Sequence, residues 1–250
     1  MTDVVITGAA RSAMGGFQGM FSDLSAADLG GAAIRAARSE AGTPEIDELL
    51  MGCVLPAGQG QAPARQAGFR AGLGEGVPAT TLNKMCGSGM KAAMMAFDQI
   101  ALGHTDVMVA GGMESMTNAP YLLKKHRSGA RLGHDTAYDH MFLDGLEDAY
   151  EEGRAMGTFA QDTANEYQLT REEMDDYSIE SLRRANAAIE SGAFDGEVVP
   201  VTIVTRKGET TVEHDEAPGK GNPDKIPQLR PAFAKDGTIT AATSSSISDG

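Results

Sequence analysis

The sequence is short of basic residues and of long apolar runs, and each shortage excludes a class of function. Lys and Arg number 21 against 35 Asp and Glu, a formal net charge of −14 at pH 7. Nucleic-acid binding needs a basic footprint, so this balance disfavours DNA or RNA as a partner. No apolar run approaches the roughly 20 residues that span a bilayer. The first residues show no basic region followed by an apolar one, so we expect no secretory signal.

Cysteine is scarce too, with only Cys53 and Cys86 in 250 residues. The two could in principle pair, but cytoplasmic thiols stay reduced, and we expect both to be free. Cys53 lies in an apolar segment and is expected to be a small core residue. A chain of this length can bury a sizeable core, in one large domain or two.

The rest of the chain is organised around Cys86. An extended run, Pro78–Met85, ends at this cysteine, and Gly87 and Gly89 follow it. The small and apolar residues that continue to Phe97 predict a helix buried on most sides. At the N-terminus of such a helix, free N–H groups and the helix dipole favour a thiolate. From these residues alone, Cys86 is either a nucleophile or a structural cysteine packed under the helix.

The first 120 residues alternate between strand and helix patterns. Besides the run before Cys86, strands are expected at Asp3–Ile6, Leu49–Leu55 and Val107–Ala110, and helices at Ser25–Gly42 and Ala64–Leu73. This alternation predicts a layered α/β domain with a mostly parallel sheet. Because reactive groups in such sheets collect at the carboxyl ends of strands, Cys86 and Gly111–Glu114 are expected to converge.

After Pro120 the pattern changes. Residues 121–157 have little periodicity, which is typical of a functional loop or an insertion. Thr170 and Glu173 form a capping box that predicts a helix to Gly192. Later expected elements are strands at Glu197–Val204, Thr210–Val212 and Thr238–Ala242, and a Gly/Pro-rich loop at Asp215–Pro227.

Four motifs resemble the signatures of the thiolase family. N-K-M-C-G-S-G-M-K-A, around Cys86, resembles the family's nucleophile motif. Three others are G-Q-x-P-A-R-Q-A at Gly60–Ala67, G-G-M-E-S-M-T-N-A-P-Y at Gly111–Tyr121 and L-R-P-A-F at Leu229–Phe233. All four occur in the family's order and at its spacing, and the similarity covers the whole chain.

The resemblance implies a thiolase-like α/β/α core half with a mostly parallel sheet and an inserted loop domain. Residues 1–120 would form the first part of the N-terminal core half. Residues 121–240 would be the loop domain and the return to the core. Residues 241–250 would begin the junction to a second core half that is missing from this chain.

The resemblance also implies an activity, with Cys86 as the catalytic nucleophile. A thiolase condenses two acetyl-CoA to acetoacetyl-CoA, or cleaves a short 3-oxoacyl-CoA with CoA, here through S-acyl-Cys86. CoA thioesters are its substrates, and neither a cofactor nor a metal is expected. The family's activating histidine (G-H-P), second cysteine (C-x-G-G-G) and asparagine (N-E-A-F) have no matching motif here. We therefore expect the missing half to be needed for turnover.

The same resemblance implies that the protein is cytoplasmic and acts in fatty acid metabolism. It also implies a homo-oligomer, either a dimer or a tetramer. The loop Tyr121–Met141 is a plausible subunit contact. The acidic net charge fits poorly with anionic CoA. Basic residues, such as those in the run Lys124–Arg127, would have to be concentrated near the CoA site.

Five residues match positions that contact CoA in the family: Leu146, Met156, Ala232, Phe233 and Ser245. The apolar members suit the pantetheine arm and the adenine face, and the Ser245 hydroxyl can bond an amide. Three departures affect the nucleotide end of this site and the acyl-chain preference. The arginine that some members place in the Asp215–Pro227 loop has no counterpart, although Lys220 or Lys225 could serve. Arg154-Ala155-Met156 stands where some members have Tyr-His-Met, and Thr243 stands where an asparagine is usual.

Two other functions stay open. The chain could be a non-catalytic, acyl-CoA-binding half-thiolase. It could also be a decarboxylating condensing enzyme of the ketoacyl-synthase type, although M-E-S-M and L-R-P-A-F argue against that class.

Overall fold

The computed structural model describes residues 3–206 and 208–250, which fall into two compact units. The first contains the residues up to Ala119 together with Phe194–Asp215 and Ser248–Gly250. The second contains Pro120–Ala193 and Glu216–Ile247. The assignment of the chain's segments to a core half, a loop domain and a junction stays a prediction.

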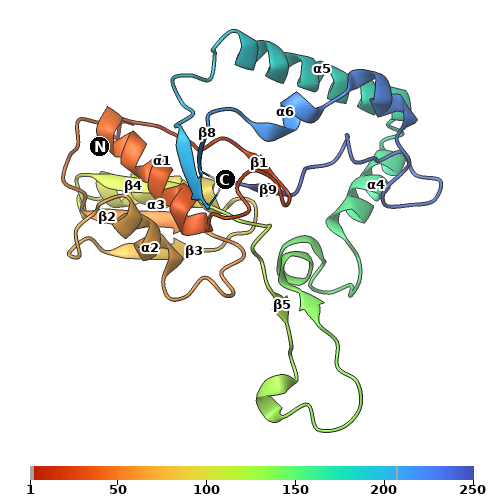
Figure 1. The fold of residues 1–250 in the computed structure, drawn as a ribbon, viewed down its shortest axis with the longest axis horizontal. Helices are drawn as coiled ribbons and strands as arrows, with labels where there is room; N and C mark the ends of the chain where they lie inside the picture. The colour runs from red at the N-terminus through yellow and green to blue at the C-terminus, as the bar shows by residue number, and fades with distance from the viewer. Residues whose placement is uncertain (1–2, 207) are drawn as a thin grey trace. The chain divides into compact units, whose positions relative to one another are not determined.

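A parallel sheet of three strands forms the frame of the first unit (Figure 1). Strand β2 (Glu48–Gly52) lies between β3 (Ala79–Leu82) and β4 (Met108–Gly112) and pairs in parallel with both. Parallel neighbours need crossover connections, and helices supply them here. The α/β class and the parallel sheet expected from the sequence are confirmed.

Three helices accompany this sheet: α1 (Ala26–Glu40), α2 (Pro63–Arg70) and α3 (Ser88–Ala101). Helix α1 begins with the expected capping box. The Asp28 N–H donates to the Ser25 hydroxyl at 3.2 Å, and the Ser25 N–H donates to the Asp28 carboxylate at 2.9 Å. These reciprocal bonds help to satisfy the N–H groups at the helix start, where the Asp28 N–H also donates to the Ser25 carbonyl at 3.0 Å.

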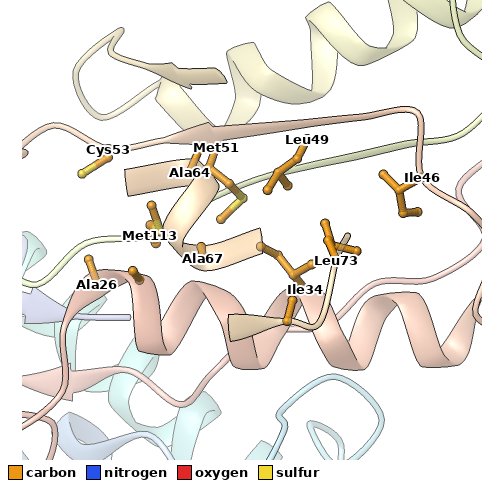
Figure 2. Close-up of a cluster of buried hydrophobic side chains, with 12 residues drawn as sticks. Ala26, Ile34, Ile46, Leu49, Met51, Cys53, Ala64, Ala67, Leu73 and Met113 are labelled. Carbon is orange, nitrogen blue, oxygen red and sulfur yellow. The ribbon is translucent and has the colours of Figure 1, made fainter. Parts of the chain in front are cut away.

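The central strand is buried on both faces. Leu49 and Met51 pack on one face into a cluster with residues of α1 and α2 (Figure 2). Leu50 points to the opposite face, where it packs with Ala92 and Ala96 of α3. Successive strand residues alternate between faces, so an unbroken apolar run marks a strand covered on both sides.

Helix α3 is less covered than the sequence predicts. Met90, Met94 and Phe97 are 74, 53 and 54% exposed. Their spacing of four and three residues puts them on one face of the helix. The expectation of a helix buried on most sides is therefore wrong for the described residues, because the sheet covers only the opposite face. Apolar composition cannot tell a covered face from an uncovered one.

The expected strand at Asp3–Ile6 is also wrong, because the structure assigns no strand there. Val5 and Ile6 are 72 and 89% exposed. A strand is stabilised by its ladder and by cross-strand side-chain pairs, and an apolar pattern alone provides neither.

The next part of the N-terminal segment is held by an ion-pair cluster. The Arg11 guanidinium contacts Asp215 and Glu197, each at 2.7 Å. Burial disfavours ionisation of Asp215, but hydrogen bonds from Arg11 and from the Met14 N–H outweigh it and lower its pKa. The cluster joins residues 11–14 to both ends of the segment that contains the hairpin of β7 (Val201–Thr205) and β8 (Gly208–Val212).

Short strands and separate helices make up the second unit. Its elements are β5 (Tyr121–Leu122), the 3-10 helix η1 (His126–Ser128), β6 (Tyr138–Asp139), the π-helix η2 (Phe142–Leu146), α4 (Met156–Glu166), α5 (Arg171–Glu190), α6 (Glu216–Lys220) and the 3-10 helix η3 (Pro223–Gln228). Helix α5 starts with the predicted capping box of Thr170 and Glu173. Within the described ranges of both units, no helix has the length and apolarity needed to cross a membrane.

Two expectations for the later residues are wrong. The supposed loop Asp215–Pro227 contains α6 and most of η3. The supposed strand Thr238–Ala242 is irregular, because the Thr238 and Ile239 N–H groups donate to the side chain of Gln161. A side-chain amide has taken the donors that a strand would offer to a neighbour. The chain forms its last strand, β9, at Ser248–Asp249, paired with β1 at Gly15–Gly16.

The packing of β2 predicts an asymmetric effect of two leucine truncations. Leu49 is fully buried, whereas Leu102 is 70% exposed. Leu49→Ala should lower the free energy of unfolding by about 3 kcal/mol, because the cavity cannot close fully. Leu102→Ala should change it by less than about 0.5 kcal/mol. Urea unfolding of both variants measures the difference, and equal effects would contradict this account of the core.

Candidate active site around Cys86

Cys86 lies on the turn that leads from β3 into α3. It is a free and exposed cysteine. Ser88, the first residue of α3, is 4% exposed and packs beneath the backbone of the turn, on its buried side. Its hydroxyl donates to the Met85 carbonyl at 2.6 Å and accepts from the Lys84 N–H at 2.8 Å. The turn is thus hydrogen-bonded internally, while the thiol faces solvent in the first unit.

The start of α3 lies against the ends of two strands, and at one of them only a glycine fits. A Cβ on Gly52, at the end of β2, would lie 2.5 Å from the Ser88 Cβ. The Gly89 Cα lies against Gly112 at the end of β4, where an added Cβ would be 3.5 Å away. Gly89 at the start of α3, three residues after Cys86, therefore lies beside Gly112, whereas the convergence of Cys86 itself with Gly111–Glu114 stays a prediction.

Glu114 ties the segments that follow β2 and β4 together. Its carboxylate accepts hydrogen bonds from the Val54 N–H at 2.7 Å and the Leu55 N–H at 3.0 Å. It also lies 3.5 Å from the Cys53 sulfur. Burial, followed by the nearby Glu114 charge, raises the pKa of Cys53 to about 12. Cys53 is therefore a buried, protonated thiol, in keeping with the predicted core role.

The five residues matched to CoA contacts belong to the second unit. Leu146 ends the π-helix, and the following residue, Glu147, bridges to Ala155 beside Met156. Met156 begins α4 and is 44% exposed. The ring of Phe233 packs on Gly157, where a Cβ would lie only 2.2 Å from the ring.

Leu146, Met156 and Phe233 are therefore grouped around the start of α4. Ala232 precedes Phe233 in the chain. Its N–H donates to the Ile239 carbonyl at 2.9 Å, which ties this segment to residue 239. Ser245 is exposed on the loop that precedes β9.

Gln161 is a positioning residue that the sequence analysis missed. It is 5% exposed, and its side-chain oxygen accepts from the Thr238 N–H at 2.8 Å and the Ile239 N–H at 3.1 Å. Its amide group donates to the Thr238 hydroxyl at 3.1 Å. These bonds hold the segment that carries Ala232 and Phe233 against α4. One signal in the sequence could have identified it: Gln161 lies three positions before Ala164, so the two residues share one face of α4, and this face is buried.

Arg154, part of one of the three departures from the family pattern, has its charge matched within the second unit. Its guanidinium contacts the carboxylates of Glu151, at 2.6 Å, and of Asp162. It also stacks over the Phe159 ring, 3.6 Å from the centroid. This arginine is therefore engaged within the second unit and is not a free cation for a phosphate group.

The fold and the site together define a class of protein: an α/β protein with an exposed cysteine on a strand-to-helix turn. Comparison with known proteins narrows this class. The chain matches the family of the thiolase N-terminal domain over residues 4–250. It therefore belongs to the thiolase family.

Relatives and a solved structure agree with this membership. Acetyl-CoA acetyltransferase 2 of Arabidopsis thaliana is 49% identical over 99% of the chain and 62% of its own length. An acetyl-CoA acetyltransferase of Pseudomonas aeruginosa is 46% identical over 100% of the chain and 64% of its own length. The crystal structure of Acat5 thiolase from Ascaris suum in complex with coenzyme A matches with a TM-score of 0.92 and 39% identity, over 99% of the chain and 64% of that structure. The chain thus spans just under two thirds of the length of these relatives.

The two thiols should differ sharply in reactivity. With a neutral reagent such as iodoacetamide at pH 8, Cys86 should label in the folded protein and Cys53 should not, because Cys53 is buried and its pKa is raised to about 12. Unfolding in urea should expose both thiols. Peptide mass spectrometry after labelling counts them, and modification of Cys53 in the folded chain would contradict the description.

The same shift in pKa has a consequence for stability. Protonated Cys53 contributes stability that is fully present below its ordinary pKa of 9.0 and is lost as the pH rises toward about 12. Cys53→Ala should therefore flatten the alkaline part of the curve of unfolding free energy against pH.

Loss of the Gln161 side-chain bonds should loosen the segment that carries Phe233. Gln161→Leu keeps the apolar bulk but removes two acceptor contacts, so exchange of the Thr238 and Ile239 amides should accelerate about tenfold or more. Gln99→Leu is the control, because Gln99 belongs to the first unit and its side chain bonds His104 there. Hydrogen–deuterium exchange measures both variants, and unchanged exchange in Gln161→Leu would remove this positioning role.

Proposed function

We propose that this chain provides the nucleophile of a thiolase, an acetyl-CoA C-acetyltransferase that acts through S-acyl-Cys86. The observation that carries the proposal is the free, exposed Cys86 on a hydrogen-bonded turn at the start of α3. Membership of the thiolase family and the names of the relatives from Arabidopsis thaliana and Pseudomonas aeruginosa support it.

The chemistry proceeds in two acyl transfers. The Cys86 thiolate attacks the thioester carbon of acetyl-CoA, the bond from that carbon to the CoA sulfur breaks, and CoA leaves as a thiolate that takes up a proton. A second acetyl-CoA then loses an α-proton, and its carbanion attacks the acetyl group on Cys86. Acetoacetyl-CoA is released and the Cys86 thiolate is regenerated. In the opposite direction, CoA and a short 3-oxoacyl-CoA are the substrates.

The complete cycle needs groups that the 250 residues do not match. The family resemblance assigns activation of the nucleophile to a histidine and proton transfer to a second cysteine, in motifs absent from this sequence. We propose that a C-terminal half, or a separate chain, supplies them. No resident cofactor is required, because the CoA thioesters are themselves the substrates.

The same proposal assigns CoA binding to the second unit. Leu146, Met156 and Phe233 offer apolar surface for the pantetheine arm and the adenine, with Ala232 beside them. Ser245 offers a hydroxyl to an amide of the pantetheine. The grouping of the first three around the start of α4 supports this part of the proposal.

The wider setting of the reaction is proposed by resemblance. We propose a cytoplasmic enzyme of fatty acid metabolism that assembles as a homotetramer or a dimer. The loop Tyr121–Met141, which is mostly exposed apart from the buried His140 and Met141, is then a candidate contact between subunits.

Acetylation of Cys86 tests the function directly. After incubation with acetyl-CoA, in the presence of the half or chain that supplies the activating histidine, the mass of this chain should increase by one acetyl group, which peptide mapping should assign to Cys86. Cys86→Ala should abolish this increase because no acceptor thiol remains at the turn. Cys53→Ala is the matched control and should still be acetylated.

Three other outcomes would contradict the proposal. Binding of acetyl-CoA without acetylation would favour a non-catalytic acyl-CoA-binding module. Acylation followed by turnover with malonyl but not acetyl thioesters would favour a ketoacyl-synthase type of enzyme. Acetylation that persists in Cys86→Ala would assign the acceptor to another residue.

A further inference from the structure

One side chain spans the Cys86 turn and the neighbouring strand end. The Asn83 side-chain oxygen accepts from the Met85 N–H at 2.9 Å. Its amide group donates to the Val54 carbonyl at 3.3 Å. Asn83 directly follows β3, and Val54 is the second residue after β2, so the two bonds join the turn to the adjacent strand end.

The turn contains a residue that needs such support. Met85, immediately before Cys86, has φ of +49°. An L-residue other than glycine is strained in this left-handed region and persists there only where its surroundings hold it. At Met85, the N–H is bonded to Asn83 and the carbonyl to Ser88. Both peptide groups that flank the strained residue are therefore held by side chains.

Val54, whose carbonyl is bonded by Asn83, is also held by the carboxylate of Glu114. The Val54 N–H donates to the Glu114 carboxylate at 2.7 Å, while its carbonyl accepts from Asn83. Glu114 follows the end of β4, and its N–H donates to the Gly250 carbonyl at 2.7 Å. A continuous set of bonds therefore runs from the end of β4, through the Val54 peptide and Asn83, to the turn that holds Cys86.

We propose that Asn83 is a positioning residue for Cys86. It keeps Met85 left-handed, so that the thiol stays beside the N-terminus of α3. Glu114 anchors the other end of the connection. The catalytic meaning of this role rests on the proposed thiolase function, whereas its effect on the thiol does not.

Alkylation of Cys86 by iodoacetamide tests the role without requiring acyl transfer. The second-order rate constant is measured at Cys86 by peptide mass spectrometry in the folded chain. Asn83→Ala should lower it by about fivefold or more, because the thiol loses its place at the helix N-terminus. Asn118→Ala is the matched control. Its side chain bonds the carbonyls of Ser22 and Leu24, and the rate should stay within about 1.5-fold of the parent.

A second-site change separates positioning from general damage. Glycine adopts positive φ without strain, so Met85→Gly removes the need for Asn83 to hold that conformation. The double variant Asn83→Ala/Met85→Gly should therefore recover at least about half of the lost rate. A loss through partial unfolding would not be recovered by a glycine, and urea unfolding of each variant reports the fold independently.

Each outcome of these measurements either supports the positioning role of Asn83 or contradicts it. Loss in Asn83→Ala with recovery in the double variant supports the positioning role. An unchanged rate in Asn83→Ala, an equal loss in Asn118→Ala, or no recovery in the double variant overturns it. If acetyl-CoA fails to acetylate the parent in the presence of the half that supplies the activating histidine, while alkylation follows the expected pattern, the thiolase proposal fails and the positioning role stands.

Discussion

The close approach of helix α3 to the end of β2 is the constraint on which the candidate site depends. A Cβ at position 52 would lie 2.5 Å from the Ser88 Cβ, a separation that real side chains do not tolerate. Because Gly52 has no side chain, Ser88 can lie under the turn and bond both Lys84 and Met85. The position of Cys86 therefore follows from backbone packing at the sheet edge as much as from the cysteine's own neighbours.

The chain uses two chemically identical thiols in opposite ways. Cys53 is 1% exposed and lies beside a carboxylate, so loss of its proton would create a buried charge next to another negative charge. Cys86 is exposed, and the hydrogen bonds of its turn are made by Asn83 and Ser88 instead of by the thiol. Burial, not residue type, separates an inert core thiol from a candidate nucleophile.

The groups that the proposed reaction needs are distributed over both units of the chain. The first unit holds Cys86, and the second groups apolar side chains around the start of α4. Membership of the thiolase family covers residues 4–250, while the chain spans 62 and 64% of the length of the two relatives. Proton transfer is the function for which this sequence offers no family-matched residue.

Much of the fold could be predicted from the sequence, because local signals there act over a few residues. The capping boxes at Ser25 and Thr170 predicted the starts of two helices, and the apolar run that begins at Leu49 predicted the strand that the structure places at the centre of the sheet. The motif around Cys86 identified the candidate nucleophile and its family, and the scarcity of cysteine left few rivals for that role.

Only the tertiary structure decided which groups meet across the chain. Apolar residues at Asp3–Ile6 and Thr238–Ala242 suggested strands, but a strand also depends on a paired neighbour, and at Thr238 the buried amide of Gln161 occupied the backbone donor. The exposed face of α3 likewise depends on what covers it and not on its composition. The link from Glu114 through Val54 to Asn83 joins residues 29 or more positions apart. No local pattern encodes such contacts, since they exist only once the parallel strands have aligned their ends.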